Sequence, residues 1–141
     1  MGRYVEIKQE QFDFKAHGGF FAFGQEQFTQ NKIGEEPFVS MGAGLYCSEA
    51  NAPALSEAFH KFVDGVNERI RKECTPQEVF DYEYNNHECD YTNDVENPCM
   101  YIIELYGIET LKKMSKAKNR KARQIKNFLD YEYKEKKDQT N

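Results

Sequence analysis

One stretch of the sequence limits the possible fold more than any other. Residues 50–75 read ANAPALSEAFHKFVDGVNERIRKECT, and apolar side chains recur there every three or four positions. They are Leu55, Phe59, Phe62, Val63, Val66 and Ile70. This spacing places them on one face of an α-helix, with Asn51 as a candidate N-cap and Pro53 in the first turn. The sequence therefore predicts an amphipathic helix of about five turns, whose apolar face other elements must cover.

Short apolar runs predict the strands of a small sheet. Residues 20–23 (FFAF) and 37–41 (PFVSM) are apolar runs bounded by turn residues, and residues 3–7 (RYVEI) form a third short run. In residues 78–86 (EVFDYEYNN), aromatic side chains occupy every second position, which is typical of a half-buried strand. The glycines of GAG (42–44) indicate a flexible loop.

Three further segments predict shorter helices. Residues 8–17 fit a short helix and residues 24–34 fit one or two helical turns, each stopped by glycine. A third helix is expected to begin near Asp94 or Asn97 and to end at Gly107. Its expected inward residues are Met100, Ile103, Leu105 and Tyr106.

Residues 108–141 favour helix but carry only a thin apolar stripe, and their charged end is expected to fray. The stripe comprises Leu111, Met114, Ala117, Ile125, Phe128 and Leu129. Together the patterns predict an α+β fold: a small antiparallel or mixed sheet packed on one long amphipathic helix, with a C-terminal helical extension. We expect an α+β core domain over residues 1–108 and a basic helix with a frayed tail over residues 109–141. Because the thin stripe needs cover, a homodimer through the C-terminal helix is also expected.

The charges divide sharply along the chain. Residues 1–111 hold 20 acids and 8 bases, a net charge of −12, whereas residues 112–141 hold 4 acids and 11 bases, a net charge of +7. Ten acids and no base lie between Glu73 and Glu109. Such asymmetry indicates that the chain interacts with charged partners.

The acidic stretch is the first candidate binding surface. Its densest part, DYEYNNHECDYTND (81–94), interleaves carboxylates with tyrosines. Spaced carboxylates can imitate a phosphate backbone and occupy a protein's nucleic-acid channel, although an ordinary acidic surface has the same composition. The candidate contact residues are Glu78, Asp81, Glu83, Glu88, Asp90 and Asp94.

The basic stretch KKMSKAKNRKARQIK (112–126) is the second candidate binding surface. It is similar to a nucleic-acid-binding helix, but it has no aromatic residue before Phe128 and so predicts no stacking platform. There are two alternatives to nucleic-acid binding. The stretch is either a solvated helix face, or it docks on the acidic half of the same or a neighbouring chain. The candidate contact residues are Lys112, Lys113, Lys116, Lys118, Arg120, Lys121, Arg123 and Lys126.

A metal site is a third interpretation. His87, Cys89 and Asp94 contain the atoms that zinc prefers. However, the H-x-C spacing matches no standard structural site, and a fourth ligand would have to come from Cys47, Cys74 or His60. We therefore expect no metal and no cofactor.

Enzymatic chemistry is the remaining alternative. A nucleophilic Cys89 activated by His60 or His17 is conceivable, but no hydrolase signature surrounds it. GAGLY (42–46) lacks the further glycines and the lysine of a phosphate-binding loop, so it reads as a turn. His87 is better explained by hydrogen bonds that satisfy backbone groups. The sequence therefore predicts a protein that is not an enzyme.

Hydropathy and cysteine usage predict the compartment. No apolar run approaches the roughly 20 residues of a membrane helix, and the first residues do not resemble a signal peptide. The four cysteines show no CxxC pair, which is typical of free thiols in a reducing cytosol. We expect a cytoplasmic protein.

Two stretches resemble a known family. FFAFGQEQF (20–28) is similar to an FFAFSxEQF segment, and YEYNNHECDYT (82–92) is similar to a YELxNHExxYT segment, of small proteins from phages and mobile elements of gut Bacteroidetes. PFVSMGAGLYC (37–47) is also similar, so the resemblance spans roughly residues 12–94. Gly24 stands where these proteins tend to have serine.

That family includes a type II-A anti-CRISPR, an inhibitor of the RNA-guided CRISPR DNA nuclease. The resemblance implies a small inhibitor that acts in a bacterial host cell and has no enzymatic activity of its own. The nuclease has basic channels for guide RNA and target DNA, which an acidic surface would fit. The basic stretch would instead contact the guide RNA or pair with a second copy of the protein. A nucleic-acid-binding accessory protein of a mobile element is the alternative function.

Overall fold

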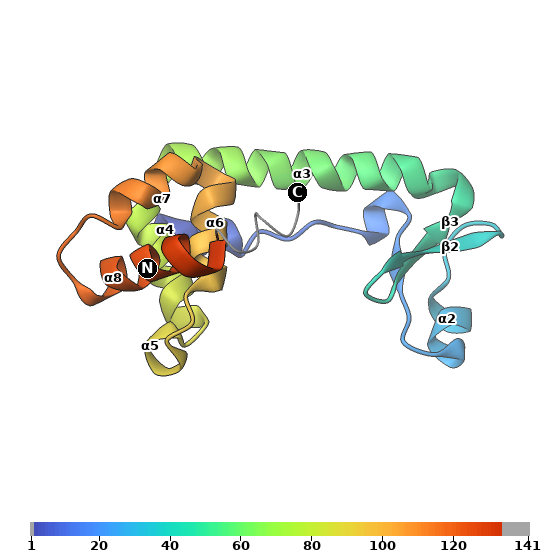
Figure 1. Ribbon diagram of the computed structural model, residues 1–141. Helices are drawn as coiled ribbons and strands as arrows, with labels where there is room; N and C mark the ends of the chain where they lie inside the picture. The colour runs from blue at the N-terminus through green and yellow to red at the C-terminus, as the bar shows by residue number, and fades with distance from the viewer. Residues whose placement is uncertain (1, 134–141) are drawn as a thin grey trace. The chain divides into compact units, whose positions relative to one another are not determined.

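The computed structural model describes residues 2–133. Contacts divide these residues into two compact units: a sheet unit (residues 10–66) and a helical unit (residues 2–9 and 67–133). The long helix α3 (Ala52–Glu73) begins in the sheet unit and ends in the helical unit, which confirms the helix predicted over residues 50–75 (Figure 1). The boundary expected between residues 108 and 109 falls inside the helical unit.

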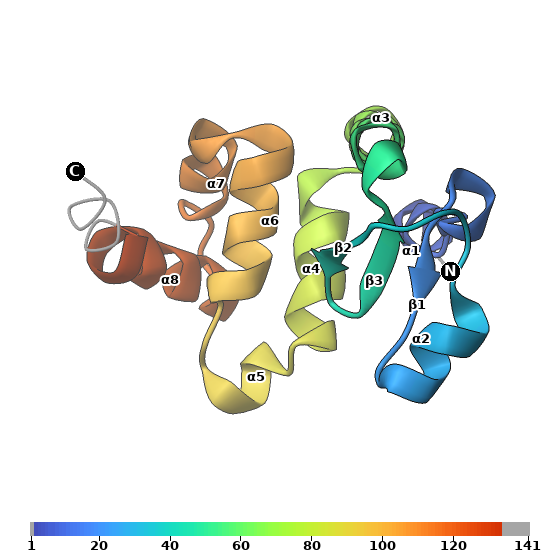
Figure 2. The same cartoon turned by 90° about the vertical axis from the view of Figure 1, so that its right-hand side faces the viewer.

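The sheet unit contains a three-stranded antiparallel sheet of order β1-β3-β2 (Figure 2). Strands β1 (Phe20–Phe21) and β2 (Phe38–Gly42) lie in the two predicted runs. The third strand, β3 (Leu45–Ser48), was not predicted; it pairs with both of the others. Ala43 and Gly44 connect β2 to β3 with positive φ angles of 52° and 82°, as a two-residue hairpin loop requires, so GAG is a tight turn.

Aromatic packing fills the sheet unit. Helix α2 (Gln25–Asn31) follows β1 as predicted. Its Phe28 meets Phe20, Phe38 and Tyr46 of the sheet with ring centroids 5.2–5.5 Å apart. The first part of α3 contributes the buried Leu55. These contacts give the small sheet an apolar core of its own.

The helix predicted over residues 8–17 is wrong. Lys8 is the last residue of α1 (Arg3–Lys8), and beyond it only Lys15–His17 form a helical turn, of the 3-10 type, which Gly18 ends with a φ of 84°. A second 3-10 turn, Glu49–Asn51, precedes α3. Asn51 lies in that turn and donates a hydrogen bond to the His17 carbonyl over 2.6 Å, so its amide joins two turns of the sheet unit.

In the described residues, the helical unit contains the end of α3, the helix α1 and five α-helices that follow α3. These are α1 (Arg3–Lys8), α4 (Pro76–Asn86), α5 (Cys89–Thr92), α6 (Glu96–Tyr106), α7 (Ile108–Met114) and α8 (Arg120–Asn127), followed by a π-helical turn, Phe128–Tyr133. Helices α4 and α6 pack side by side in both views (Figures 1 and 2). Phe80, Ile102, Leu111 and Phe128 are among its fully buried side chains. With the sheet, these helices confirm the α+β fold.

The strand predicted over residues 78–86 is wrong, because this segment is helix α4. Its N-cap is Thr75, whose hydroxyl accepts a hydrogen bond from the backbone N–H of Glu78 over 3.1 Å. Pro76 occupies the first helical position, where its missing N–H costs nothing. The aromatic residues at 80 and 84 are one helical turn apart, so both are buried.

The strand predicted over residues 3–7 is also wrong. These residues lie in α1, and Tyr4 and Ile7, three positions apart, share its buried face. The backbone N–H of Tyr4 donates a hydrogen bond to the Glu78 carboxylate over 2.9 Å. This contact ties the first turn of α1 to the first turn of α4.

Helix α6 begins and ends close to the predicted positions. The Asp94 carboxylate accepts a hydrogen bond from the backbone N–H of Glu96 over 3.0 Å, and Gly107 follows the last helical residue with a φ of 98°. The expected burial is only partly confirmed. Met100 is 40% exposed, because it lies on the opposite face from the buried Pro98, Cys99, Ile102 and Leu105.

The C-terminal segment is helical, as expected, but it is divided into α7, α8 and the π-helical turn. The Asn119 side chain caps α8 by accepting a hydrogen bond from the backbone N–H of Ala122 over 2.8 Å. Three of the six residues of the apolar stripe, Leu111, Ile125 and Phe128, are buried inside the helical unit, which weakens the reason for expecting a homodimer; the homodimer itself stays a prediction. The frayed end expected at residues 134–141 lies outside the described residues.

Among the residues that the structure describes, no helix combines the length and the apolar character that a membrane crossing needs.

Candidate functional site

The carboxylate of Glu83 is fully buried in the helical unit. It accepts a hydrogen bond from the Tyr4 hydroxyl over 2.9 Å, forms an ion pair with Lys8, and lies 3.2 Å from His87 Nε2. A buried carboxylate is stable only when it is paired and hydrogen-bonded, and here three partners satisfy it. Glu83 therefore fastens α1 to α4. The prediction that it forms part of a partner-binding surface is wrong, because no partner can reach it.

Tyrosines surround the cation of this buried pair. The Lys8 ammonium lies 5.6 Å from the ring centroid of Tyr4 and 5.2 Å from the centroids of both Tyr82 and Tyr101. The ring quadrupoles add to the attraction from the carboxylate. The pKa of the Tyr4 hydroxyl is raised well above its ordinary value, first by burial and then by its hydrogen bond to Glu83. Tyr4 is therefore a protonated donor at neutral pH.

The other five acidic candidates do not form one free surface either. Glu78 caps the start of α1, and Asp81 pairs with Lys121 over 2.9 Å. Asp90 is exposed but pairs with Arg120, and Asp94 is exposed but caps α6. Glu88 is exposed with no ion pair to any described residue.

Two of the basic candidates bind the acidic half of the same chain. Lys121 reaches α4 through Asp81, and its ammonium lies 4.8 Å from the Tyr84 ring centroid. Arg120 donates to the Asp90 carboxylate and, over 3.3 Å, to the Asp90 carbonyl. The structure thus confirms, for these two residues, the docking of basic stretch on acidic stretch that the sequence left open.

Five basic candidates are exposed and form no ion pair with a described residue. We call them the basic face: Lys113, Lys116, Lys118, Arg123 and Lys126. Lys112, also exposed, pairs with Glu109, one helical turn before it, over 3.4 Å and with no other acid among residues 2–133. The basic face runs from the end of α7 through the connecting loop to α8.

A buried side-chain amide, which no sequence pattern predicted, holds α8 in place. The Gln124 side chain is buried, accepts a hydrogen bond from the Tyr84 hydroxyl over 2.8 Å and donates one to the Asn93 side chain over 2.7 Å. Ala122 and Ile125 are buried on the same side of α8. Because this side is fixed against the unit, Arg123 and Lys126 are directed to solvent.

The cysteine and histidine candidates do not assemble a reactive centre in the described residues. Cys89 is fully buried, and burial together with the nearby Asp94 carboxylate raises the pKa of its thiol. A raised pKa disfavours the thiolate that a nucleophile or a zinc ligand must provide. His87 contacts Glu83 instead, and His60 and His17 lie close to backbone carbonyls of their own turns. All four cysteines are free and buried.

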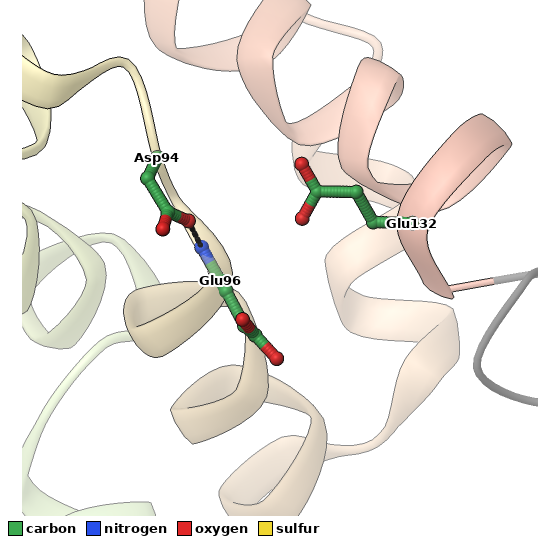
Figure 3. A group of neighbouring side chains, drawn as sticks. All are labelled: Asp94, Glu96 and Glu132. Atoms are coloured by element: carbon green, nitrogen blue, oxygen red, sulfur yellow. Dashed lines mark hydrogen bonds between the residues drawn. The ribbon is translucent and has the colours of Figure 1, made fainter.

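Three carboxylates do lie together at another place in the helical unit (Figure 3). Asp94 precedes α6, Glu96 begins it, and Glu132 belongs to the π-helical turn; their oxygen atoms lie within 4.8 Å of one another. Carboxylate oxygens suit hard cations such as Mg²⁺ or Ca²⁺. The Asp94 carboxylate already has a structural role as the cap of α6, and Asp94 and Glu132 are exposed to water. The cluster alone identifies no ligand.

Comparisons place the chain in a family without assigning it a function. No curated protein matches the chain, and no solved structure matches it. A family model described as "Family of unknown function (DUF7659)" matches residues 3–127, which include described parts of both units. The chain belongs to this family, DUF7659.

Proposed function

We propose that the protein binds nucleic acid through the basic face and has no catalytic activity of its own. The observation that carries this proposal is the set of five exposed cations, gathered between Lys113 and Lys126, that pair with no acid of the described chain. A cation that is already paired with an acid of its own protein attracts a phosphate only weakly. An unpaired cation binds the phosphate and releases the counterions of the nucleic acid.

The surroundings of the basic face favour contact with a phosphate backbone. The buried side of α8 fixes the direction in which Arg123 and Lys126 project, so these two cations lie on a rigid element. No aromatic side chain lies among residues 112–126 to stack on bases. Contacts to phosphate position a nucleic acid without reading its sequence. We therefore infer binding with little sequence preference.

Removing the basic face should abolish this binding. If each of the five cations neutralises one phosphate, the logarithm of the association constant falls with the logarithm of salt concentration with a slope of about −4.5 for duplex DNA and about −3.5 for a single strand. A variant with all five residues changed to Gln is expected to lose most of that slope and most of the affinity at low salt. Fluorescence anisotropy of labelled duplex DNA and single-stranded RNA, titrated at several salt concentrations, measures both.

A control variant that removes four cations elsewhere separates the basic face from the change in net charge. Lys15, Lys32, Lys61 and Lys72 are exposed and lie outside residues 112–126, so their joint replacement by Gln should leave the salt slope nearly unchanged. The absence of measurable affinity of the wild-type protein for either nucleic acid at low salt would remove the proposal.

Inhibition of a type II RNA-guided DNA nuclease in the bacterial cytoplasm is a second candidate function, favoured by the resemblance of residues 20–28 and 82–92. The acidic-surface mechanism is weakened, because Glu83 is buried and Asp81 and Asp90 are paired. The form that the geometry supports is contact of the basic face with the guide RNA.

A pull-down against the nuclease, with and without guide RNA, run beside a DNA-cleavage assay, tests this second function. The wild-type protein is expected to bind only the guide-loaded nuclease and to slow cleavage, and the five-residue Gln variant to do neither. Equal inhibition by that variant would exclude the basic face as the inhibitory surface. Cleavage at the same rate with and without the wild-type protein would remove the function itself.

A further inference from the structure

A cavity of about 1060 Å³, open to solvent and with both apolar and polar walls, is formed entirely by residues of the sheet unit. Six phenylalanines line it: Phe12, Phe14, Phe20, Phe21, Phe59 and Phe62. Phe21 and Phe59 remain 41% and 37% exposed, although they are large apolar side chains. A cavity of this size with aromatic walls is typical of a ligand-binding site.

Contacts between the phenylalanines give the cavity a fixed wall. Phe12 meets Phe14, Phe59 and Phe62 with ring centroids 4.9–5.5 Å apart, and Phe14 meets Phe21 at 5.4 Å. Most of these pairs are edge-to-face, the favoured arrangement of aromatic rings. The wall therefore exists before any ligand arrives, which lowers the entropy cost of binding.

The charged groups of the cavity favour an anion. Lys15 and Lys32 line it, are exposed, and form no ion pair with a described residue. Asp13 is the acid among the lining residues, and its carboxylate accepts a hydrogen bond from the backbone N–H of Ala16 over 3.0 Å. The two lysine ammonium groups are thus available to a carboxylate, while Asp13 already has a partner in the chain.

We propose that this cavity binds a small apolar molecule that carries one anionic group, such as a medium-chain fatty acid or a multi-ring aromatic acid. The phenylalanines would hold the apolar body, and Lys15 and Lys32 would hold the anionic group. This site is separate from the basic face, since it uses none of those residues.

Comparing a carboxylate with its neutral alcohol tests the proposal. Decanoate is expected to displace the fluorescent aromatic anion 1-anilinonaphthalene-8-sulfonate from the protein in a saturable manner, and decanol to do so about tenfold less well, because exposed ion pairs to two lysines contribute only modestly. The Lys15→Gln/Lys32→Gln variant should bind decanoate and decanol equally. Both substitutions lie on exposed side chains, so the variant should fold.

Two further variants localise the binding. Lys61→Gln/Lys72→Gln removes the same charge outside the cavity and should keep the preference for decanoate. Phe59→Ala should weaken decanoate and decanol alike, because it removes part of the apolar wall without touching the charges. Non-saturable binding of both anions, or equal displacement by decanoate and decanol in the wild-type protein, would overturn the proposal.

Discussion

Replacing Glu83 with alanine is expected to destabilise the helical unit by about 3–5 kcal/mol, the usual result of removing one partner from a buried ion pair. The substitution leaves the buried Tyr4 hydroxyl without its acceptor and Lys8 without its carboxylate, and it removes two of the contacts that join α1 to α4. Because domains are stable by only about 5–15 kcal/mol, a loss of this size should be visible as a large shift in urea unfolding followed by circular dichroism.

Two variants control for this experiment. Glu88→Ala removes an exposed carboxylate from the same acidic stretch and should change the free energy of unfolding by less than about 0.5 kcal/mol. Glu83→Gln keeps an acceptor for Tyr4 but loses the charge that pairs with Lys8, so its effect should fall between the two. A Glu83→Ala variant as stable as Glu88→Ala would show that the buried carboxylate does not hold α1 and α4 together.

Elements that depend on local sequence were predicted well. The helix α3 follows from six apolar residues that all repeat at helical spacing, and β1 and β2 follow from runs bounded by glycine and proline. The segment 78–86 was predicted wrongly because aromatic residues at alternate positions fit two structures. Residues 80 and 84 lie on the same face of a strand, where side chains alternate, and also on the same face of a helix, where they are one turn apart. The decisive signal was Thr75-Pro76-Gln77-Glu78, a sequence typical of a helix start that precedes the apolar residues.

The contacts of the candidate residues could not be predicted from the sequence, because they join distant parts of the chain. The sequence shows ten acids followed by eight bases, but not that Asp81 pairs with Lys121 and Asp90 with Arg120. Nor does it show that Glu83 is buried, since this depends on Tyr4 and Lys8 at the other end of the chain. The composition therefore predicted more unpaired acidic surface than the structure has. In the basic stretch, most of the predicted contact residues are exposed, as expected.

Replacing Phe128 with alanine is the second substitution for which we expect a large effect. Phe128 is the first residue of the π-helical turn and only 1% exposed. Losing a fully buried phenylalanine commonly costs about 3–5 kcal/mol, from lost apolar burial and from the cavity left behind. If residues 109–133 belong to the helical unit, this loss should appear in the main unfolding transition, measured by urea titration. Tyr131→Ala, three residues further along the chain at a residue that is 71% exposed, should change the free energy of unfolding by less than about 0.5 kcal/mol.

The concentration dependence of the same measurement decides between two explanations of the apolar stripe. If Phe128 is covered by its own chain, the midpoint of unfolding and the effect of Phe128→Ala should be the same at micromolar and at hundredfold higher protein concentration. If a second copy covers the stripe, folding is coupled to association, and the wild-type midpoint should rise with concentration while that of the variant does not. Since Leu111, Ile125 and Phe128 are each at most 2% exposed within one chain, we expect no concentration dependence.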